Sequence, residues 1–337
     1  MTPFFFGLAG QRLTDDERAL FGEVDPAGYI LFKRNIADRA QLRALTDDLR
    51  ALSGRADLPI LIDQEGGRVA RMQPPEWPEF PKAERFDAAY EVAPVSAIEA
   101  VRANARAIAL MLAEAGITVD CLPLLDVRQP GASDIIGDRA FGSEPLRVAA
   151  LGRAAIDGLR DGGVVGVVKH MPGHGRALVD SHHELPVVDA ALEELETDLA
   201  PFIALKHAPM AMTAHVVYTA WDPENCATLS PKVIEEVIRN GIGFDGLLMT
   251  DDLGMHALKG DFGERTRRAL EAGVDIVLHC SGDFNEMKAC VAPANEIGTA
   301  SRSRLDRAMA TVATPASIPP FDELLATRDQ FLAAVNA

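Results

Sequence analysis

The chain carries the stretch Val164-Val165-Gly166-Val167-Val168-Lys169-His170-Met171-Pro172-Gly173-His174-Gly175 (residues 164–175), in which an aliphatic run leads into a polar loop. The run is short, β-branched and apolar throughout, which predicts a buried strand of a parallel sheet. A cation and two imidazoles follow it in a segment rich in glycine and proline. We therefore expect a strand of the core here, with part of a functional site at its carboxyl end.

Eight aliphatic or β-branched runs of this kind alternate with longer amphipathic segments, a pattern typical of repeated βα units. The runs lie at residues 4–8, 29–32, 60–63, 117–122, 164–170, 210–216, 247–251 and 275–279. Helices are expected between them at about 14–22, 38–53, 97–115, 144–161, 189–206, 231–240, 262–272 and 283–297. Eight such pairs predict an α/β fold, a single (β/α)8 TIM-type barrel. An open doubly wound sheet is the alternative, and it would place ligands at the same strand ends.

Helix-capping residues support these boundaries. Thr14 precedes Glu17 by three residues, Ser143 directly precedes Glu144, and Ser230 is followed by proline. We expect residues 1–337 to form one catalytic domain, with a C-terminal helical tail at 300–337 packed on the barrel. The tail contains an apolar helical stretch around residues 321–335.

Composition restricts the partners of the protein. The chain has 337 residues, 48% of them hydrophobic, and a formal net charge of −17. This charge argues against binding to nucleic acid or to an anionic membrane, whose phosphates would repel it. The N-terminal apolar run is too short for a signal peptide or a membrane span. The four cysteines are scattered, without metal or disulfide spacing. We expect a cytoplasmic monomer that binds a small molecule.

Polar residues fall where the predicted strands end, which is the face on which barrel enzymes build their sites. This set consists of Asp63, Lys169-His170, His215, Asp251 and His279. A further pair, Asp180 and His182, lies in the loop after the fifth strand. An aspartate two residues before a histidine can orient and charge the imidazole for proton transfer near neutral pH.

The third strand ends in the segment Asp63-Gln64-Glu65-Gly66-Gly67-Arg68-Val69-Ala70-Arg71. A carboxylate at this position can accept hydrogen bonds from sugar hydroxyls, and the glycines let the backbone turn closely around a ligand. A tight turn with a salt bridge is the simpler interpretation of such a motif when it stands alone. Arg139, on the loop after the fourth strand, would in isolation be a solvated residue.

Two adjacent carboxylates, Asp251 and Asp252, follow the seventh strand. Successive side chains of a strand point in opposite directions, so one of the two is expected beneath a substrate. The alternation does not choose between them, because both faces of this strand are apolar. A helix N-cap is the alternative role for either residue.

A metal site is a competing hypothesis. His170, His174, His182 and His183 lie close in sequence and could chelate a transition metal together with Asp180 or Asp251. Their spacing matches no His-Glu-x-x-His helix, and Pro172 with two glycines prevents a helix here. We expect no metal and no cofactor. A non-catalytic sugar-binding barrel is a second alternative, but it leaves Asp180, His182 and Asp251 without a role.

Four separated segments resemble the β-N-acetylglucosaminidase branch of glycoside hydrolase family 3. That branch reads Lys-His-x-Pro-Gly-x-Gly, four free positions, then Asp-Ser/Thr-His, and residues 169–182 fill every fixed position. The segments at 63–71, 137–142 and 246–255 are similar to three further family segments. The chain length is similar to the single-domain, cytoplasmic form of these enzymes.

The resemblance implies an exo-acting enzyme that retains anomeric configuration and releases terminal N-acetylglucosamine from cell-wall muropeptides in peptidoglycan recycling. It assigns the nucleophile to Asp251 and acid/base catalysis to His182 with Asp180 as its orienting partner. Sugar contacts are expected from Asp63, Arg71, Arg139, Lys169 and His170. The loop 172–184 would have to close over the sugar to bring His182 to the glycosidic oxygen. Phosphate in place of water as the acceptor, which would make the enzyme a phosphorylase, stays open.

Overall fold

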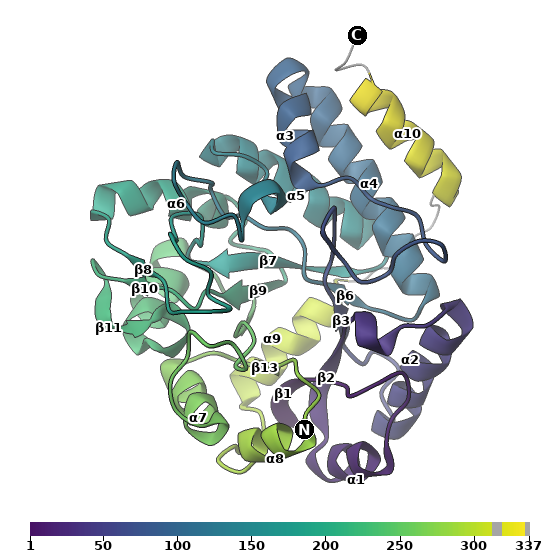
Figure 1. Ribbon diagram of the computed structural model, residues 1–337, viewed down its shortest axis with the longest axis vertical. Helices are drawn as coiled ribbons and strands as arrows, with labels where there is room; N and C mark the ends of the chain where they lie inside the picture. The colour runs from purple at the N-terminus through teal and green to yellow at the C-terminus, as the bar shows by residue number, and fades with distance from the viewer. Residues whose placement is uncertain (312–318, 334–337) are drawn as a thin grey trace.

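The computed structural model describes residues 1–311 and 319–333. Its main sheet has eight strands in the order β12-β9-β7-β6-β3-β2-β1-β13. All neighbours in this order pair in parallel, and a parallel bridge between Met249 and Ile276 joins the two outer strands. The strands are β1 (Thr2–Gly7), β2 (Pro26–Leu31), β3 (Ile60–Ile62), β6 (Val119–Asp120), β7 (Val165–Met171), β9 (Met210–Thr213), β12 (Leu247–Met249) and β13 (Val277–His279). The predicted (β/α)8 barrel is therefore confirmed (Figure 1).

A helix follows each barrel strand. The first seven lie within about three residues of the predicted bounds, whereas the eighth ends at residue 291 and not at the predicted 297. These helices are α1 (Asp15–Val24), α2 (Arg39–Ser53), α4 (Pro94–Glu114), α5 (Pro145–Asp161), α6 (Leu192–Ala204), the π-helix η4 (Val233–Ile242), α7 (Phe262–Ala272) and α8 (Phe284–Val291). None of the helices in the described residues combines the length and the apolar character that a membrane span requires.

The long loops contain elements that were not predicted. After β3 come the hairpin β4 (Gln64–Gly66) and β5 (Val69–Ala70), and the helix α3 (Ala83–Val92). A small sheet combines β8 (Val187–Val188), β10 (Val217–Tyr218) and β11 (Asp222–Cys226). The short 3-10 turns are η1 (Lys33–Asn35), η2 (Gly137–Arg139) and η3 (Ala227–Leu229).

Two of the three predicted helix caps form. Thr14 and Glu17 make a complete capping box at the start of α1, and the Ser230 hydroxyl accepts a hydrogen bond from the N–H of Val233 at 3.1 Å. The expectation for Ser143 is wrong, because α5 begins at Pro145 with Glu144 at the N-cap position and no side-chain cap.

Side-chain alternation along each strand separates two cores. In β1, Phe5 belongs to the cluster inside the barrel, whereas Phe4 and Phe6 face the surrounding helices. The other strands follow the same rule, since neighbouring residues of a strand point to opposite faces. Inward-facing residues from the eight strands and their ends include Phe5, Ile30, Leu61, Val119, Val165, Val167, Met210, Met212, Leu247, Met249 and Leu278.

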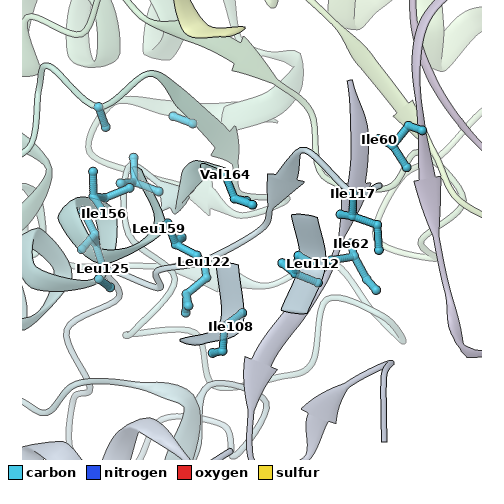
Figure 2. Close-up of a cluster of buried hydrophobic side chains, with 14 of the residues drawn as sticks. Ile60, Ile62, Ile108, Leu112, Ile117, Leu122, Leu125, Ile156, Leu159 and Val164 are labelled. Carbon is cyan, nitrogen blue, oxygen red and sulfur yellow. The ribbon is translucent and has the colours of Figure 1, made fainter. Parts of the chain in front are cut away.

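The outer core lies between the barrel and its helices. Figure 2 shows part of it, where Leu112 lies near Ile62 and Ile117, and Leu159 lies near Leu122. All of these side chains are buried. Burial of one large aliphatic side chain stabilises the fold by about 1.5–3 kcal/mol. This apolar layer makes the barrel a rigid support for the residues at its strand ends.

The C-terminal tail contributes two helices with different positions. In α9 (Thr299–Met309), Leu305 and Ala308 join the cluster inside the barrel, and Arg304 binds Asp275, which precedes β13, at 3.0 Å. This helix therefore covers the amino-terminal end of the barrel. In contrast, α10 (Phe321–Ala333) lies outside against α4, where Leu324 and Leu332 are buried (Figure 1). Residues 334 and 335 of the predicted apolar stretch lie outside the described residues.

We predict that Leu305→Ala lowers the free energy of unfolding by about 2–5 kcal/mol, because it removes a buried side chain from the end of the barrel core. Urea denaturation would measure the change. The exposed neighbour Ser303, replaced by alanine, serves as the control and should shift the value by less than about 0.5 kcal/mol. Equal small effects of both variants would show that α9 adds little to the core.

Candidate active site

A cavity of about 290 Å³ lies at the carboxyl ends of the barrel strands. Seven of the eight predicted site residues line it, namely Asp63, Arg71, Arg139, Lys169, His170, His182 and Asp251. The eighth, Asp180, does not line the cavity and instead contacts His182. The cavity also contains apolar wall residues from several strands, among them Ile30, Met212 and Leu278.

The alternation of the strands explains which residues reach the cavity. Leu61, Val167 and Met249 face the barrel interior, so the residues two positions later point into its mouth. These residues are Asp63, Lys169 and Asp251. The same rule resolves the choice between the adjacent carboxylates that the sequence left open, because Asp251 shares the inward direction of Leu247 and Met249.

Lys169 lies at the centre of a network of buried charges. Its side chain is 2% exposed, and its Nζ lies 3.1 Å from Asp63 Oδ1 and 2.7 Å from Glu65 Oε1. Asp63 also binds Arg71 at 2.9 Å, and Glu65 accepts two hydrogen bonds from Arg139, each 2.8 Å long. The network joins the end of β3, the end of β7 and the turn η2.

These contacts control the protonation of the network. Burial alone would raise the pKa of both carboxyl groups, but Lys169 and Arg71 hold the pKa of Asp63 far below its usual range. In the same way, Arg139 and Lys169 lower the pKa of Glu65 to about 2. Both acids are therefore ionised at neutral pH. Asp63 presents a fixed acceptor to a ligand in the cavity, whereas Glu65 holds Lys169 and Arg139 in place.

Glu65 and Asp126 do not line the cavity, but they bind residues that do, and the sequence analysis did not assign them. Glu65 stands two residues after Asp63, a spacing that places both on one face of an extended segment. Asp126 is fully buried and accepts a 2.8 Å hydrogen bond from His170 Nδ1, together with the backbone N–H groups of His170 and His174. Burial would raise its pKa, but His170 and these bonds lower it to about 2. The sequence signal for Asp126 was its position as an acidic residue directly after the apolar run 121–125.

Asp251 has a polar environment that favours its charged form. Although burial raises its pKa, the imidazoles of His170 and His215 and the backbone N–H of Asp252 outweigh this effect and keep the pKa below its usual value. Asp252 also borders the cavity, but its Oδ1 accepts hydrogen bonds from the backbone N–H groups of Gly254 and Cys280. The first acid is thus available in the cavity, whereas the second holds the local backbone.

The loop after β7 carries the Asp180–His182 pair. Asp180 Oδ1 lies 2.8 Å from His182 Nδ1 and also accepts the backbone N–H of His182. The His182 side chain is 56% exposed and reaches the wall of the same cavity as Asp251. This geometry occupies Nδ1 and leaves Nε2 available to a ligand.

Two strand-end histidines do not belong to the cavity lining. His215 is buried and bonded to Thr228 Oγ1 and to the backbone oxygen of Asp252, so it supports the turn behind Asp251. His279 has the outward direction of β13, opposite to Leu278, and binds Glu286 at 3.0 Å. These two residues therefore stand at strand ends without lining the cavity.

The histidines near the cavity do not converge on one point. His170 pairs with Asp126 and His182 with Asp180, whereas the His183 side chain is 81% exposed. Within residues 1–311 and 319–333, no group of three or more histidine, cysteine, aspartate or glutamate side chains is arranged to hold a metal ion.

The arrangement combines three chemical capacities in one cavity. An ionised carboxylate can attack an electrophilic carbon, and an imidazole with a carboxylate partner can give or take a proton. Fixed carboxylate, ammonium and guanidinium groups can bind several hydroxyls. These capacities together suit the cleavage of a glycosidic bond.

Comparison with known proteins agrees with this chemistry. Residues 7–314 match the family described as "Glycosyl hydrolase family 3 N terminal domain". A protein of Alkalilimnicola ehrlichii named beta-hexosaminidase is 42% identical over 284 residues, which cover 83% of this chain and 80% of that protein. The structure of native NagZ from Neisseria gonorrhoeae matches with a TM-score of 0.86 and 32% identity, over 100% of this chain and 98% of the other.

A second structure of the Neisseria gonorrhoeae NagZ, in complex with N-trifluoroacetyl-D-glucosamine, also matches with a TM-score of 0.86 and 32% identity, over 100% of this chain and 98% of the other. The family resemblance inferred from the four sequence segments is confirmed by these matches. The chain belongs to glycosyl hydrolase family 3 and is a glycoside hydrolase.

Proposed function

We propose that the enzyme is a retaining exo-β-N-acetylglucosaminidase, which acts in the cytoplasm on cell-wall muropeptides during peptidoglycan recycling. The observation that carries this proposal is the presence of Asp251 and the Asp180-bound His182 on one cavity. The relatives point to a 2-acetamido sugar as the substrate. One of them is named beta-hexosaminidase, and another, NagZ, was crystallised with an N-acylated glucosamine.

In the first step, an Asp251 oxygen attacks the anomeric carbon of the terminal sugar. The bond from that carbon to the leaving-group oxygen breaks, and His182 gives its proton to this oxygen. In the second step, water attacks the same carbon, His182 takes a proton from the water, and the bond to Asp251 breaks. Two inversions leave the anomeric configuration unchanged.

The role of Asp180 in this scheme is to orient His182. Its carboxylate accepts a hydrogen bond from the Nδ1–H group of His182, with 2.8 Å between Oδ1 and Nδ1. The proton that is exchanged with the substrate is therefore carried by Nε2. A carboxylic acid in this position would need an apolar environment to stay protonated at neutral pH, which an exposed loop does not provide.

The buried charge network would bind the sugar ring. Asp63 and Lys169 are held by each other and by Arg71, so their hydrogen-bonding atoms do not need to be ordered when the substrate arrives. Arg139 and His170 are fixed in the same way by Glu65 and Asp126. Ligand pockets commonly have volumes of about 300–1,000 Å³, and the volume of this cavity, about 290 Å³, is close to the lower end of that range. This volume suits one sugar residue and therefore exo action.

We predict that aryl N-acetylglucosaminides are cleaved with a kcat/KM at least about a hundredfold higher than that of matched aryl glucosides. A site that hydrogen-bonds a polar group of its substrate discriminates strongly against an analogue that lacks this group, here the acetamido group. The released sugar would be measured with and without phosphate, and with a chelator. Similar values for both sugars would refute the acetamido preference. Formation of the sugar 1-phosphate would instead identify a phosphorylase, and inactivation by the chelator a metal-dependent enzyme.

We predict that His182→Ala lowers kcat/KM by about 10²–10⁴-fold for alkyl or saccharide leaving groups, and by less than about tenfold for dinitrophenyl glycosides, because good leaving groups need no proton. Asp180→Ala should show the same bias more weakly. His183→Ala, at the exposed neighbouring position, is the matched control and should behave as the parent enzyme. Equal losses on both substrate classes would remove His182 from the acid role.

We predict a covalent glycosyl intermediate on Asp251, trapped with a fluorinated slow substrate and located by peptide mass spectrometry. Asp251→Asn should give no adduct. The rival mechanism uses the acetamido oxygen of the substrate as the nucleophile, and it also retains configuration. Absence of an adduct, together with strong inhibition by a bicyclic thiazoline that mimics the oxazoline, would favour this rival and refute the role of Asp251.

A further inference from the structure

The loop that carries His182 has a firmly held first half, residues 172–177. Tyr218 donates a 2.7 Å hydrogen bond to the backbone oxygen of Gly173, and Arg176 forms an ion pair with the buried Asp198 of α6. The oxygens of Gly175 and Ala177 accept hydrogen bonds from the backbone N–H groups of Gln129 and Ser133. This half is therefore attached to three neighbouring parts of the barrel.

Close packing adds to these bonds. A Cβ atom added at Gly175 would lie 1.9 Å from the backbone oxygen of Val127, a distance that no side chain tolerates. His174 is 3% exposed, its N–H binds Asp126 Oδ1 at 2.6 Å, and its ring packs edge-on against His170 at 5.7 Å. The position of His174 is thus fixed with respect to the cavity.

The second half of the loop, residues 178–184, is mainly exposed. Leu178, His182, His183 and Glu184 face solvent, and Ser181 alone is buried within this fully described segment, at 3% exposure. The bonds of Asp180 to His182, His183 and Glu184 are all local to the segment. They order the segment internally but do not attach it to the barrel.

One contact connects the two halves. Ser181 Oγ lies 3.1 Å from His174 Nε2, and among the hydrogen bonds of the described residues it is the one that leaves the segment 178–184. Both residues line the same cavity as Asp251. Because Ser181 directly precedes His182, this bond restrains the backbone next to His182, the proposed acid.

We propose that Ser181 and His174 are positioning residues, whose hydrogen bond holds His182 at the cavity wall for proton transfer. The inference rests on the acid/base role proposed above for His182. Neither residue exchanges a proton with the substrate in this scheme. Both act by limiting the positions that the His182 imidazole can occupy.

The hydrogen bond between Ser181 and His174 can persist throughout the reaction. Burial and the neighbouring His170 lower the pKa of His174 to about 4, so its ring is neutral in the working range of a neutral-pH enzyme. A hydroxyl can donate or accept, and the bond therefore forms with either neutral tautomer of His174. Its strength would not change when His182 gains or loses its proton during the reaction.

The test compares Ser181→Ala with Ser181→Thr, which keeps the hydroxyl, and with Leu178→Ala, an exposed control in the same segment. We expect Ser181→Ala to lower kcat/KM about tenfold for alkyl or saccharide leaving groups and less than about twofold for dinitrophenyl glycosides. Ser181→Thr and Leu178→Ala should retain the parent values. His174→Phe should resemble Ser181→Ala, and the double variant should lose little more than either single change.

Hydrogen–deuterium exchange gives a second, independent measurement. In Ser181→Ala, amides of residues 178–184 should exchange about tenfold faster, with unchanged exchange in β7 and an unchanged melting temperature. Unaltered exchange and unaltered kcat/KM in this variant would overturn the proposal. So would equal losses on both leaving groups, which would indicate an effect on substrate binding.

Measurement of His182→Ala in parallel separates the two proposals. If His182→Ala shows no dependence on the leaving group, the acid role of His182 is refuted, and the positioning role falls with it. If His182→Ala shows the dependence and Ser181→Ala does not, the positioning role alone is refuted.

Discussion

The buried ammonium group of Lys169 constrains the whole candidate site. Transfer of a charge from water to the protein interior costs several kcal/mol, and only close partners of opposite charge offset it. Asp63 and Glu65 provide these partners, and they in turn bind Arg71 and Arg139. The end of β3, the end of β7 and the turn η2 must therefore keep their relative positions, since displacement of any one would leave a buried charge uncompensated.

Features of the fold that depend on local periodicity could be predicted from the sequence. The eight strands and the helices between them followed from apolar runs and amphipathic segments, and the inward direction of Asp63 and Lys169 follows from side-chain alternation. The choice between Asp251 and Asp252 required knowledge of which strand face is inside. That information arises from closure of the barrel, because both faces of β12 are apolar.

Contacts between distant segments could not be predicted in this way. Glu65 forms ion pairs with Lys169 and Arg139, and Asp126 pairs with His170. These contacts depend on the register of the strands and on the conformation of the long loops. The outward position of His279 has the same origin, since one residue along a strand exchanges the two faces. Family resemblance supplied residue roles that periodicity does not contain. It did not indicate the contacts of Ser181 with His174, or the placement of α9.

The position of α9 has a consequence for the order of events during turnover. Apolar side chains fill the barrel interior, and Leu305 and Ala308 of α9 extend this filling at the amino-terminal end. A substrate must therefore enter and leave by the same opening. In the proposed mechanism, the part of the substrate beyond the cleaved bond would occupy that opening, so it would have to depart before water could arrive. The sugar, bound deepest, would then be the last to leave, and high concentrations of free sugar would compete directly with new substrate.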